Sequence, residues 1–238
     1  MFVRSFAIQG SWNYRTLIGA GLAFTLLPGL RALYRDEPER LDEAVRRHTQ
    51  LFNAHPYLAP MGVGAVVMLE EEGESPAVIE RFKAAIRGSL GTLGDRLVWA
   101  GWRPVCLVFA IALLLLGVRW WAVLGAFLVV YNVGHLALRA WAFRLGWRRG
   151  RGVGEQLRRS AVPQLQRVLS VVGAFVLGVV LPLLGSGHLA GARLALPWLL
   201  AAAVAAGLGA RYGERVRRPI VVAIVGFALA GLLLKLVI

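Results

Sequence analysis

The chain has one cysteine among its 238 residues, Cys106, and few acidic residues in its C-terminal half. A disulfide within the chain and a cysteine-based zinc site both need at least two cysteines, so both are excluded. Of the 13 acidic residues only two, Glu155 and Glu214, follow Asp95. The four histidines show no metal-ligand spacing. The sequence therefore predicts no metal site.

Apolar side chains dominate instead. Hydrophobic residues make up 58% of the chain and charged residues only 17%, whereas soluble domains carry about 25% charged residues. The net charge of +14 comes from 27 basic residues, nearly all arginine. These arginines separate apolar runs and do not alternate with aromatic residues, which is typical of membrane proteins and not of nucleic-acid-binding proteins. The sequence predicts an integral membrane protein.

The C-terminal part carries about five apolar runs. They cover Val105–Val118, Trp120–Leu138, Val168–Leu184, Leu194–Ala210 and Ile220–Leu234. Since a bilayer core of about 30 Å needs about 20 helical residues, the second run is long enough to cross and the others need flanking residues. Arg103 and Pro104 interrupt the segment before the first run, which indicates a broken or re-entrant helix there.

The N-terminal part alternates short apolar runs with charged segments. Mixed charges from Tyr34 to Gln50 predict a helix starting near Pro38, with an apolar face formed by Leu41, Val45, His48 and Phe52. A second amphipathic helix is expected over Ser75–Leu90. The apolar runs Leu17–Leu30 and Leu58–Leu69 are too short to cross a bilayer alone.

These patterns define the expected fold. It is an all-α, polytopic helical membrane protein with an N-terminal arm and short re-entrant or broken helices. We expect residues 1–96 to form an amphipathic and re-entrant region and residues 97–238 to form a membrane helical region. The segment from Arg139 to Arg167 carries eight arginines and the segment from Arg211 to Arg218 carries four. Both should lie in the cytoplasm, with the C-terminus outside.

Four uncommon strings occur in order along the first 100 residues. They are Gln9-Gly10-Ser11-Trp12-Asn13-Tyr14, Phe52-Asn53-Ala54-His55-Pro56-Tyr57, Met68-Leu69-Glu70-Glu71-Glu72 and Gly94-Asp95. With them come Leu33-Tyr34, His48, Trp99, Arg103-Pro104, Asn132 and Gly146-Trp147-Arg148-Arg149-Gly150. In this order and spacing, the chain resembles the IID component of the mannose/fructose/sorbose family of the bacterial phosphotransferase system.

This resemblance implies a multi-pass protein of the bacterial inner membrane. It would translocate a hexose or an amino sugar together with a IIC membrane subunit, while cytoplasmic IIA and IIB proteins carry the phosphate. The chain itself has no Walker loop and no recognisable phosphocarrier histidine, so we expect no catalytic residue and no cofactor. A hetero-oligomer in the lipid membrane follows from the resemblance.

The chain departs from the family pattern at three places. Arg96 follows the Gly-Asp pair, Ser89 stands where a proline is common, and Gly185–Pro197 is short. These differences keep an alternative open, in which the chain is an orphan IID-like scaffold or regulatory protein without transport activity.

Three carboxylates are candidate substrate ligands. Carboxylates accept hydrogen bonds, and sugars offer many hydroxyl donors. Glu70 and Glu71 fit this role, Glu71 in particular, but the acidic run also fits a solvated helix end. Asp95 lies beside an apolar segment, where an ionisable group commonly serves function. Its alternative role is an ion pair with Arg96 or Arg103.

Asn13, Asn53 and His55 complete the predicted substrate-binding set. Each offers both donors and acceptors to a sugar. Asn53 and His55 also fit the capping of a helix break before Pro56, which is the more common role of an isolated His-Pro turn. Asn13 lies in an N-terminal arm that is also suited to packing against a partner subunit.

Overall fold

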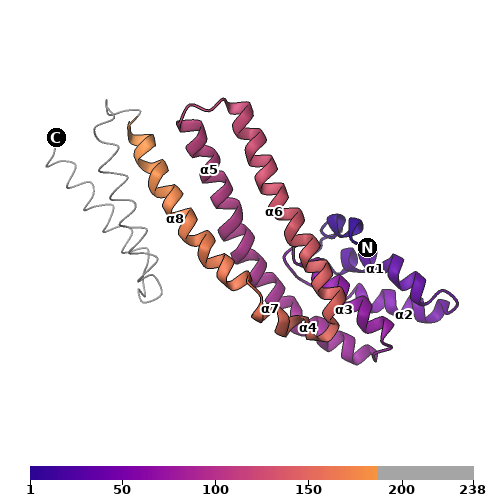
Figure 1. Cartoon of the computed structure of the whole chain (residues 1–238). Coiled ribbons are helices and arrows are strands. Elements are labelled where there is room, and N and C mark those ends of the chain that lie inside the picture. The colour runs from indigo at the N-terminus through magenta and orange to yellow at the C-terminus, as the bar shows by residue number, and fades with distance from the viewer. Residues whose placement is uncertain (187–238) are drawn as a thin grey trace. The chain divides into compact units, whose positions relative to one another are not determined.

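A computed structural model describes residues 1–186 (Figure 1). These residues are helical and contain no β-strand beyond isolated bridges at Leu17. Packing divides them into two units. The first combines Met1–Ala100 with Val129–Gln166, and the second combines Gly101–Leu128 with residues 167–186. The segment Val129–Gln166 thus packs with the N-terminal region.

The elements follow the predicted order along the chain. They are η1 (Val3–Ala7), α1 (Gly19–Leu33), α2 (Pro38–His48), α3 (Ala59–Glu71), α4 (Pro76–Gly94), a π-helical segment (Asp95–Trp102), α5 (Arg103–Leu115), α6 (Trp120–Arg149), η3 (Gly150–Gly152), α7 (Val153–Arg159) and α8 (Val162–Ser186). The all-α prediction is confirmed for the described residues.

Helix α3 forms the centre of the first unit. Eleven of its 13 residues are buried, so it has no solvent-facing side. With 13 residues it is about 20 Å long, which is too short to cross a bilayer. Both glycines of the helix lie against neighbouring elements: a Cβ on Gly62 would meet the Phe52 ring at 3.0 Å, and one on Gly64 would meet the carbonyl oxygen of Phe143 in α6 at 2.6 Å. Because these two glycines have no side chain, Phe52 and α6 can approach the backbone of α3 closely and enclose it.

Helix α2 covers this centre with one face, as its sequence predicts. Pro38 occupies the first turn, where its missing N–H costs nothing. Ala44 and His48 are buried, Leu41 and Val45 pack partly buried against the core, and Phe52 just beyond the helix is fully buried.

The expected break at Arg103-Pro104 is absent. Helical structure continues from α4 through the π-helical segment into α5, with Pro104 in the first turn of α5. A proline ring clashes with the carbonyl four residues earlier and lacks an N–H. The wider π-helical turns before Pro104 give that carbonyl room, so the helix changes its winding and does not end.

Among the described residues, two helical stretches are long and apolar enough to cross a membrane. They are Pro76–Leu115 and Trp120–Gly173. Helix α6, in the second, exposes large apolar side chains along most of its length, including Trp120, Val129 and Val133. Side chains of this kind need lipid or another protein around them.

The arginine-rich segment from Arg139 to Arg167, expected on the cytoplasmic side, is not an irregular connection. It is mostly helical, and Arg139 itself is buried within α6. The predicted segments Leu194–Ala210, Arg211–Arg218 and Ile220–Leu234, and the C-terminus, lie outside the described residues.

Candidate functional site

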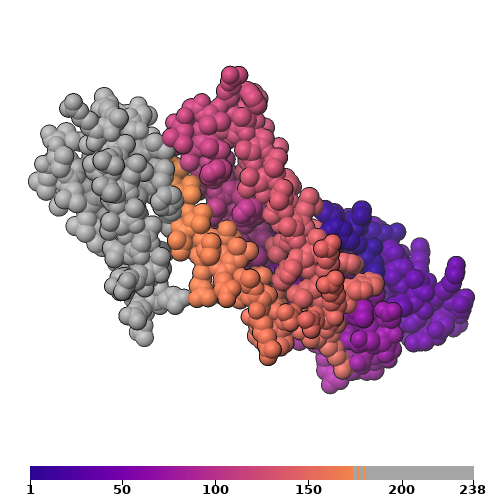
Figure 2. Space-filling view, viewed as in Figure 1, coloured from indigo at the N-terminus to yellow at the C-terminus, as the bar shows by residue number. Residues whose placement is uncertain are grey.

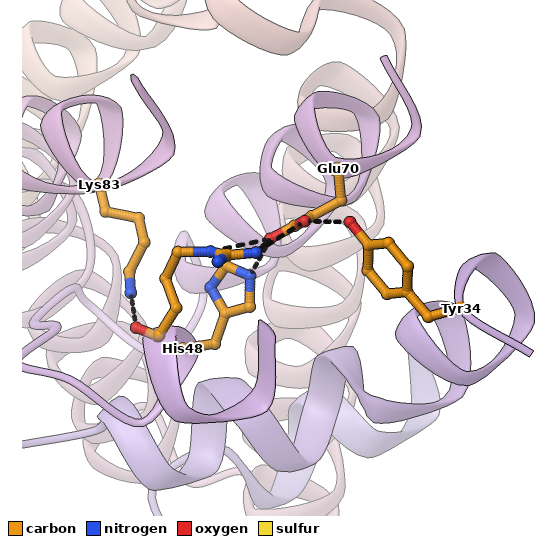
Figure 3. Close-up of polar contacts among 5 residues, drawn as sticks. Tyr34, His48, Glu70 and Lys83 are labelled. Carbon is orange, nitrogen blue, oxygen red and sulfur yellow. Dashed lines mark hydrogen bonds and ion pairs between the residues drawn. The ribbon is translucent and has the colours of Figure 1, made fainter. Parts of the chain in front are cut away.

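A buried carboxylate joins three helices of the first unit, α1, α2 and α3, and a lysine of α4 bonds to α2 beside it. Glu70, near the end of α3, accepts a hydrogen bond from the Tyr34 hydroxyl at 2.6 Å and one from Arg47 Nη2 at 2.8 Å. His48 Nε2 lies 2.7 Å from the same carboxylate. Lys83 of α4 donates to the backbone carbonyl of Arg47 at 2.7 Å. Figure 3 shows Tyr34 and His48 approaching Glu70 from different elements. We call Tyr34, Arg47, His48, Glu70 and Lys83 the Glu70 cluster.

The contacts hold Glu70 in its charged form. Burial alone would raise its pKa, but hydrogen bonds from His48, Tyr34 and Arg47 outweigh this and lower the pKa to about 2. Burial, together with the Glu70 hydrogen bond, raises the pKa of Tyr34 to about 12. Burial lowers the pKa of His48, so its ring is neutral near pH 7 and donates from Nε2 to the carboxylate. Tyr34 donates likewise from its neutral hydroxyl.

This arrangement is suited to holding helices together and leaves little for chemistry. Glu70 is 4% exposed and His48 is fully buried, and neither lines a described hollow. The lone pairs of Glu70 are occupied by three side chains. Removing one partner from a buried charged pair of this kind strongly destabilises the fold.

Stability should therefore fall in acid. Glu70 has a folded pKa of about 2 against an ordinary 4.5, so its contribution is present above about pH 4.5 and is lost as the pH falls toward about 2. The pKa of His48 is lowered from 6.5 in the folded chain. Below pH 6.5 the unfolded chain therefore binds a proton at this position that the folded chain does not bind, and stability falls. His55, with its pKa lowered to about 4, acts in the same direction. Thermal denaturation of the protein, extracted in detergent with the subunits that accompany it, should show a nearly constant Tm between about pH 7 and pH 8 and a falling Tm from pH 6.5 downward.

The control variant is His48→Gln, which keeps a donor for Glu70 and removes one titrating group. It should reduce the slope between pH 6.5 and 4.5. An unchanged slope would show that His48 is not the buried neutral group described.

A second cluster surrounds His55 near the start of α3. The His55 ring lies 4.9 Å from the Trp99 ring and 5.0 Å from the Tyr57 ring, measured between centroids. Tyr57 stacks on His135 of α6 at 3.8 Å and its hydroxyl lies 2.7 Å from that of Tyr131. No carboxylate belongs to this cluster, which offers ring faces and donors.

Buried Arg139 fixes one side of this second cluster. Its Nη1 donates to the carbonyl of Ser5 in η1 at 2.7 Å, and its Nε donates to His135 Nε2 at 3.1 Å. Its guanidinium lies over the rings of Phe6 and Tyr57. Arginine thus ties the N-terminal arm to α6 through hydrogen bonds and cation–π contacts.

His55 keeps one ring nitrogen without a partner among the described residues. Its Nδ1 accepts from the backbone N–H of Tyr57 at 3.2 Å, so the proton of the neutral ring lies on Nε2. That Nε2 is buried and makes no hydrogen bond in the described part of the chain. Burial, the Arg139 charge and His135 lower the pKa of His55 to about 4. The ring is therefore a neutral donor near pH 7.

Two of the four sequence strings, those containing His55 and Gly94, meet at this second cluster. Backbone hydrogen bonds join Ile18 to Phe52 at 3.0 Å, which brings the arm beside the Asn53–His55 string. Gly94 packs against His55 so closely that a Cβ would lie 2.1 Å from the His55 Cβ. Asn53 and Asp95 are exposed next to these contacts. In the sequence, only the order of the strings indicated that these residues belong together.

Asn13 serves a local turn. Its Oδ1 accepts the backbone N–H of Arg15 and Thr16, and its Nδ2 donates to the Thr16 hydroxyl at 2.9 Å. Asp95 makes no ion pair with Arg96 and its side chain has no hydrogen-bond partner among the described residues. Asp95 therefore keeps its acceptors available.

The six predicted ligands fall into two groups and not one. Asn13, Asn53, His55 and Asp95 lie toward the start of α3, whereas Glu70 and Glu71 lie at its end. About 20 Å of helix separates the two ends, more than one hexose can bridge. Glu71 is partly open and lines a hollow with Met1, Leu33 and Trp147.

Sequence reasoning missed Arg47 and Lys83 in the Glu70 cluster and gave Tyr34 no function. Arg47 and Lys83 look like ordinary members of solvated, mixed-charge helices. Only the inward position of His48 on α2 pointed to the cluster.

Comparison with known proteins gives the family. A model of the PTS system mannose/fructose/sorbose family IID component matches residues 1–184. The chain belongs to this family. IID components are membrane subunits of phosphotransferase permease complexes and are not catalytic themselves.

Individual relatives agree with the family match. The chain is 29% identical over 185 residues to the mannose-specific EIID component of Escherichia coli, covering 75% of this chain and 64% of the relative. It is 28% identical to the fructose permease IID component of Bacillus subtilis over 75% of this chain and 66% of the relative. The chain thus spans less than two thirds of the length of the Escherichia coli relative.

Solved structures give the same result. A cryo-EM structure of the mannose transporter ManYZ with a microcin contains a chain that is 29% identical, with a TM-score of 0.57 over 74% of this chain and 66% of that chain. A further structure, described only as a membrane protein, has a TM-score of 0.65 at the same identity and coverage.

Proposed function

We propose that the chain is the IID subunit of a phosphoenolpyruvate-dependent sugar transporter in a bacterial inner membrane, crossing the membrane several times. It translocates a hexose or amino sugar with a IIC subunit, and a IIB protein, charged by IIA, phosphorylates the sugar. The family match over residues 1–184 carries this proposal, because it includes the whole first unit.

The exposed apolar surfaces support a membrane partner. Helix α3 is too short to cross alone, and α6 leaves large apolar side chains such as Trp121, Leu128 and Val133 uncovered. A IIC subunit and lipid together would cover these side chains. Alone in detergent, the chain should therefore be unstable or aggregated.

Asp95, Asn53 and the Nε2–H of His55 form the sugar-facing group of this proposal. The first two are exposed acceptors and donors, and the third is a buried donor without a partner in the described part. Aromatic faces of Tyr57 and Trp99 lie beside them. Glu70, occupied by three side chains, positions α3, while Glu71 and Asn13 remain candidates at more distant positions.

Deletion of the gene in the organism that encodes it tests the function. Uptake of radiolabelled hexoses and amino sugars should fall for at least one sugar, together with the appearance of its phosphate ester inside the cell. Expression of the chain from a plasmid should restore both the uptake and the phosphate ester. Normal uptake and phosphorylation of every sugar would favour the orphan-scaffold alternative.

The variant Asp95→Asn should lower uptake while membrane accumulation stays normal. Asparagine keeps the shape and removes the charge, and a hydrogen bond to a charged acceptor contributes about 1.5–3 kcal/mol, or about 10–100-fold in affinity. Uptake and phosphorylation should fall together. The control is Asp42→Asn, which removes an exposed carboxylate paired only with Arg46 on α2. Wild-type uptake by Asp95→Asn would remove Asp95 from the site.

A further inference from the structure

Two arginines near the end of α6 have no partner among the described residues. Arg144 and Arg148 are exposed and make no ion pair or hydrogen bond in the described part of the chain. Two arginines of the following segments are different: Arg151 pairs with Glu74 at 2.9 Å, and Arg159 pairs with Glu155 at 2.7 Å. Two positive charges one helical turn apart therefore point to an anion from outside the chain.

These arginines border an apolar hollow. Phe2, Phe143 and Trp147 line a hollow of about 420 Å³ together with Met1 and both arginines. The Phe2 and Phe143 rings meet edge to face at 5.8 Å, and Trp147 is 38% exposed. Such a hollow accepts a hydrocarbon chain, while the arginines at its edge accept a phosphate.

Helix α6 places the hollow at the level of lipid headgroups. From Trp120 to Trp147 the helix rises about 40 Å, which matches the thickness of a bilayer with its headgroup regions. A tryptophan next to an arginine at each end is typical of the two interfaces. The end with Arg144 and Arg148 is rich in arginine, and the sequence therefore predicts that it lies on the cytoplasmic side, where anionic lipids attract basic residues. That end of α6, salmon-coloured, can be followed on the surface in Figure 2.

Glu71 lies on the other side of Trp147. It lines a separate hollow of about 310 Å³ with Pro28 and Val67. A carboxylate repels a phosphate, so the headgroup belongs with the arginines and not in this second hollow.

We propose that Arg144 and Arg148 bind the phosphate of one anionic phospholipid whose acyl chain lies along Phe2, Phe143 and Trp147. The lipid would cover apolar surface at the cytoplasmic end of α6 and fix the depth of the first unit in the membrane. This site is independent of sugar transport, since none of its residues belongs to the sugar-facing group.

Native mass spectrometry of the full chain, extracted from membranes with whatever subunits accompany it, tests the site. Wild-type protein should retain phosphatidylglycerol in preference to phosphatidylcholine. The variant Arg144→Gln/Arg148→Gln should bind phosphatidylglycerol about 30-fold more weakly, at about fivefold for each arginine. The control Arg158→Gln/Arg159→Gln removes the same charge nearby, but from arginines already paired with Glu155. Its lipid binding should change less than about twofold.

Four results would overturn the proposal. Equal lipid retention by both double variants would show that the arginines do not form a site. Displacement of the lipid by excess glycerol phosphate would show a free-anion site without an acyl-chain contribution. Loss of an accompanying membrane subunit from Arg144→Gln/Arg148→Gln, with lipid retention unchanged, would assign the hollow to a protein partner. Equal binding of phosphatidylglycerol and phosphatidylcholine by the wild-type protein would contradict the proposal on its own.

Discussion

Replacing Glu70 with alanine should destabilise the first unit by about 3–5 kcal/mol, because it leaves a buried arginine and a buried histidine without their acceptor. The Arg47 side chain is 10% exposed and His48 is fully buried, so water cannot replace the lost carboxylate. Tyr34 loses its partner as well. Thermal denaturation of the detergent-extracted protein should show a Tm lower by about 10 °C or more.

The neighbouring residue provides the control. Glu71 has the same chemistry and is only one position away, but it makes no ion pair among the described residues. Glu71→Ala should change stability by less than about 0.5 kcal/mol. Similar Tm values for Glu70→Ala and Glu71→Ala would contradict the view that Glu70 holds α1, α2 and α3 together.

A methyl group added at Gly146 should separate α6 from α3. A Cβ at this position would lie 2.0 Å from the carbonyl oxygen of Met61 and 3.0 Å from the backbone nitrogen of Ala65. Both neighbours are backbone atoms of a buried helix and cannot move alone. Gly146→Ala should therefore cost about 3 kcal/mol, at the upper end of the range for overpacking. We expect reduced membrane accumulation and a lower Tm.

Gly125 in the same helix gives a matched control. Nothing lies within 4 Å of a Cβ at Gly125. Because alanine favours helix over glycine by about 0.5–1 kcal/mol, Gly125→Ala should leave stability unchanged or raise it slightly. If Gly146→Ala were as stable as Gly125→Ala, the close approach of α3 and α6 would not exist in the membrane.

The helical framework was predictable because it follows from local pattern. Pro38 and the apolar face of Leu41, Val45 and His48 indicated α2 nearly as it is observed. The short run Leu58–Leu69 predicted a helix that does not cross the membrane, and α3 has the expected length. Local rules failed at Pro104, because a π-helical segment satisfies the proline without ending the helix.

The Glu70 cluster was not predictable because its members are far apart in sequence. Glu70 and Tyr34 are 36 positions apart, and so are Lys83 and Arg47. In the sequence, Glu70 is one of three consecutive glutamates, and nothing local distinguishes the buried one. Only the packing of α3 against α1 and α2 decides it, since that packing turns Glu70 inward and leaves Glu71 open. Arg139 was likewise counted with the cytoplasmic arginines by its charge, although its hydrogen bonds to Ser5 allow its burial within α6.

Purification of the tagged full chain from the membranes of the organism that encodes it tests the transporter proposal most directly. The account predicts that a IIC-like membrane subunit accompanies the chain in mild detergent. It also predicts that the complex, supplied with phosphoenolpyruvate and the soluble phosphotransferase proteins, converts a hexose or amino sugar to its phosphate. A stable chain that purifies without any membrane subunit, and supports no sugar phosphorylation, would contradict it.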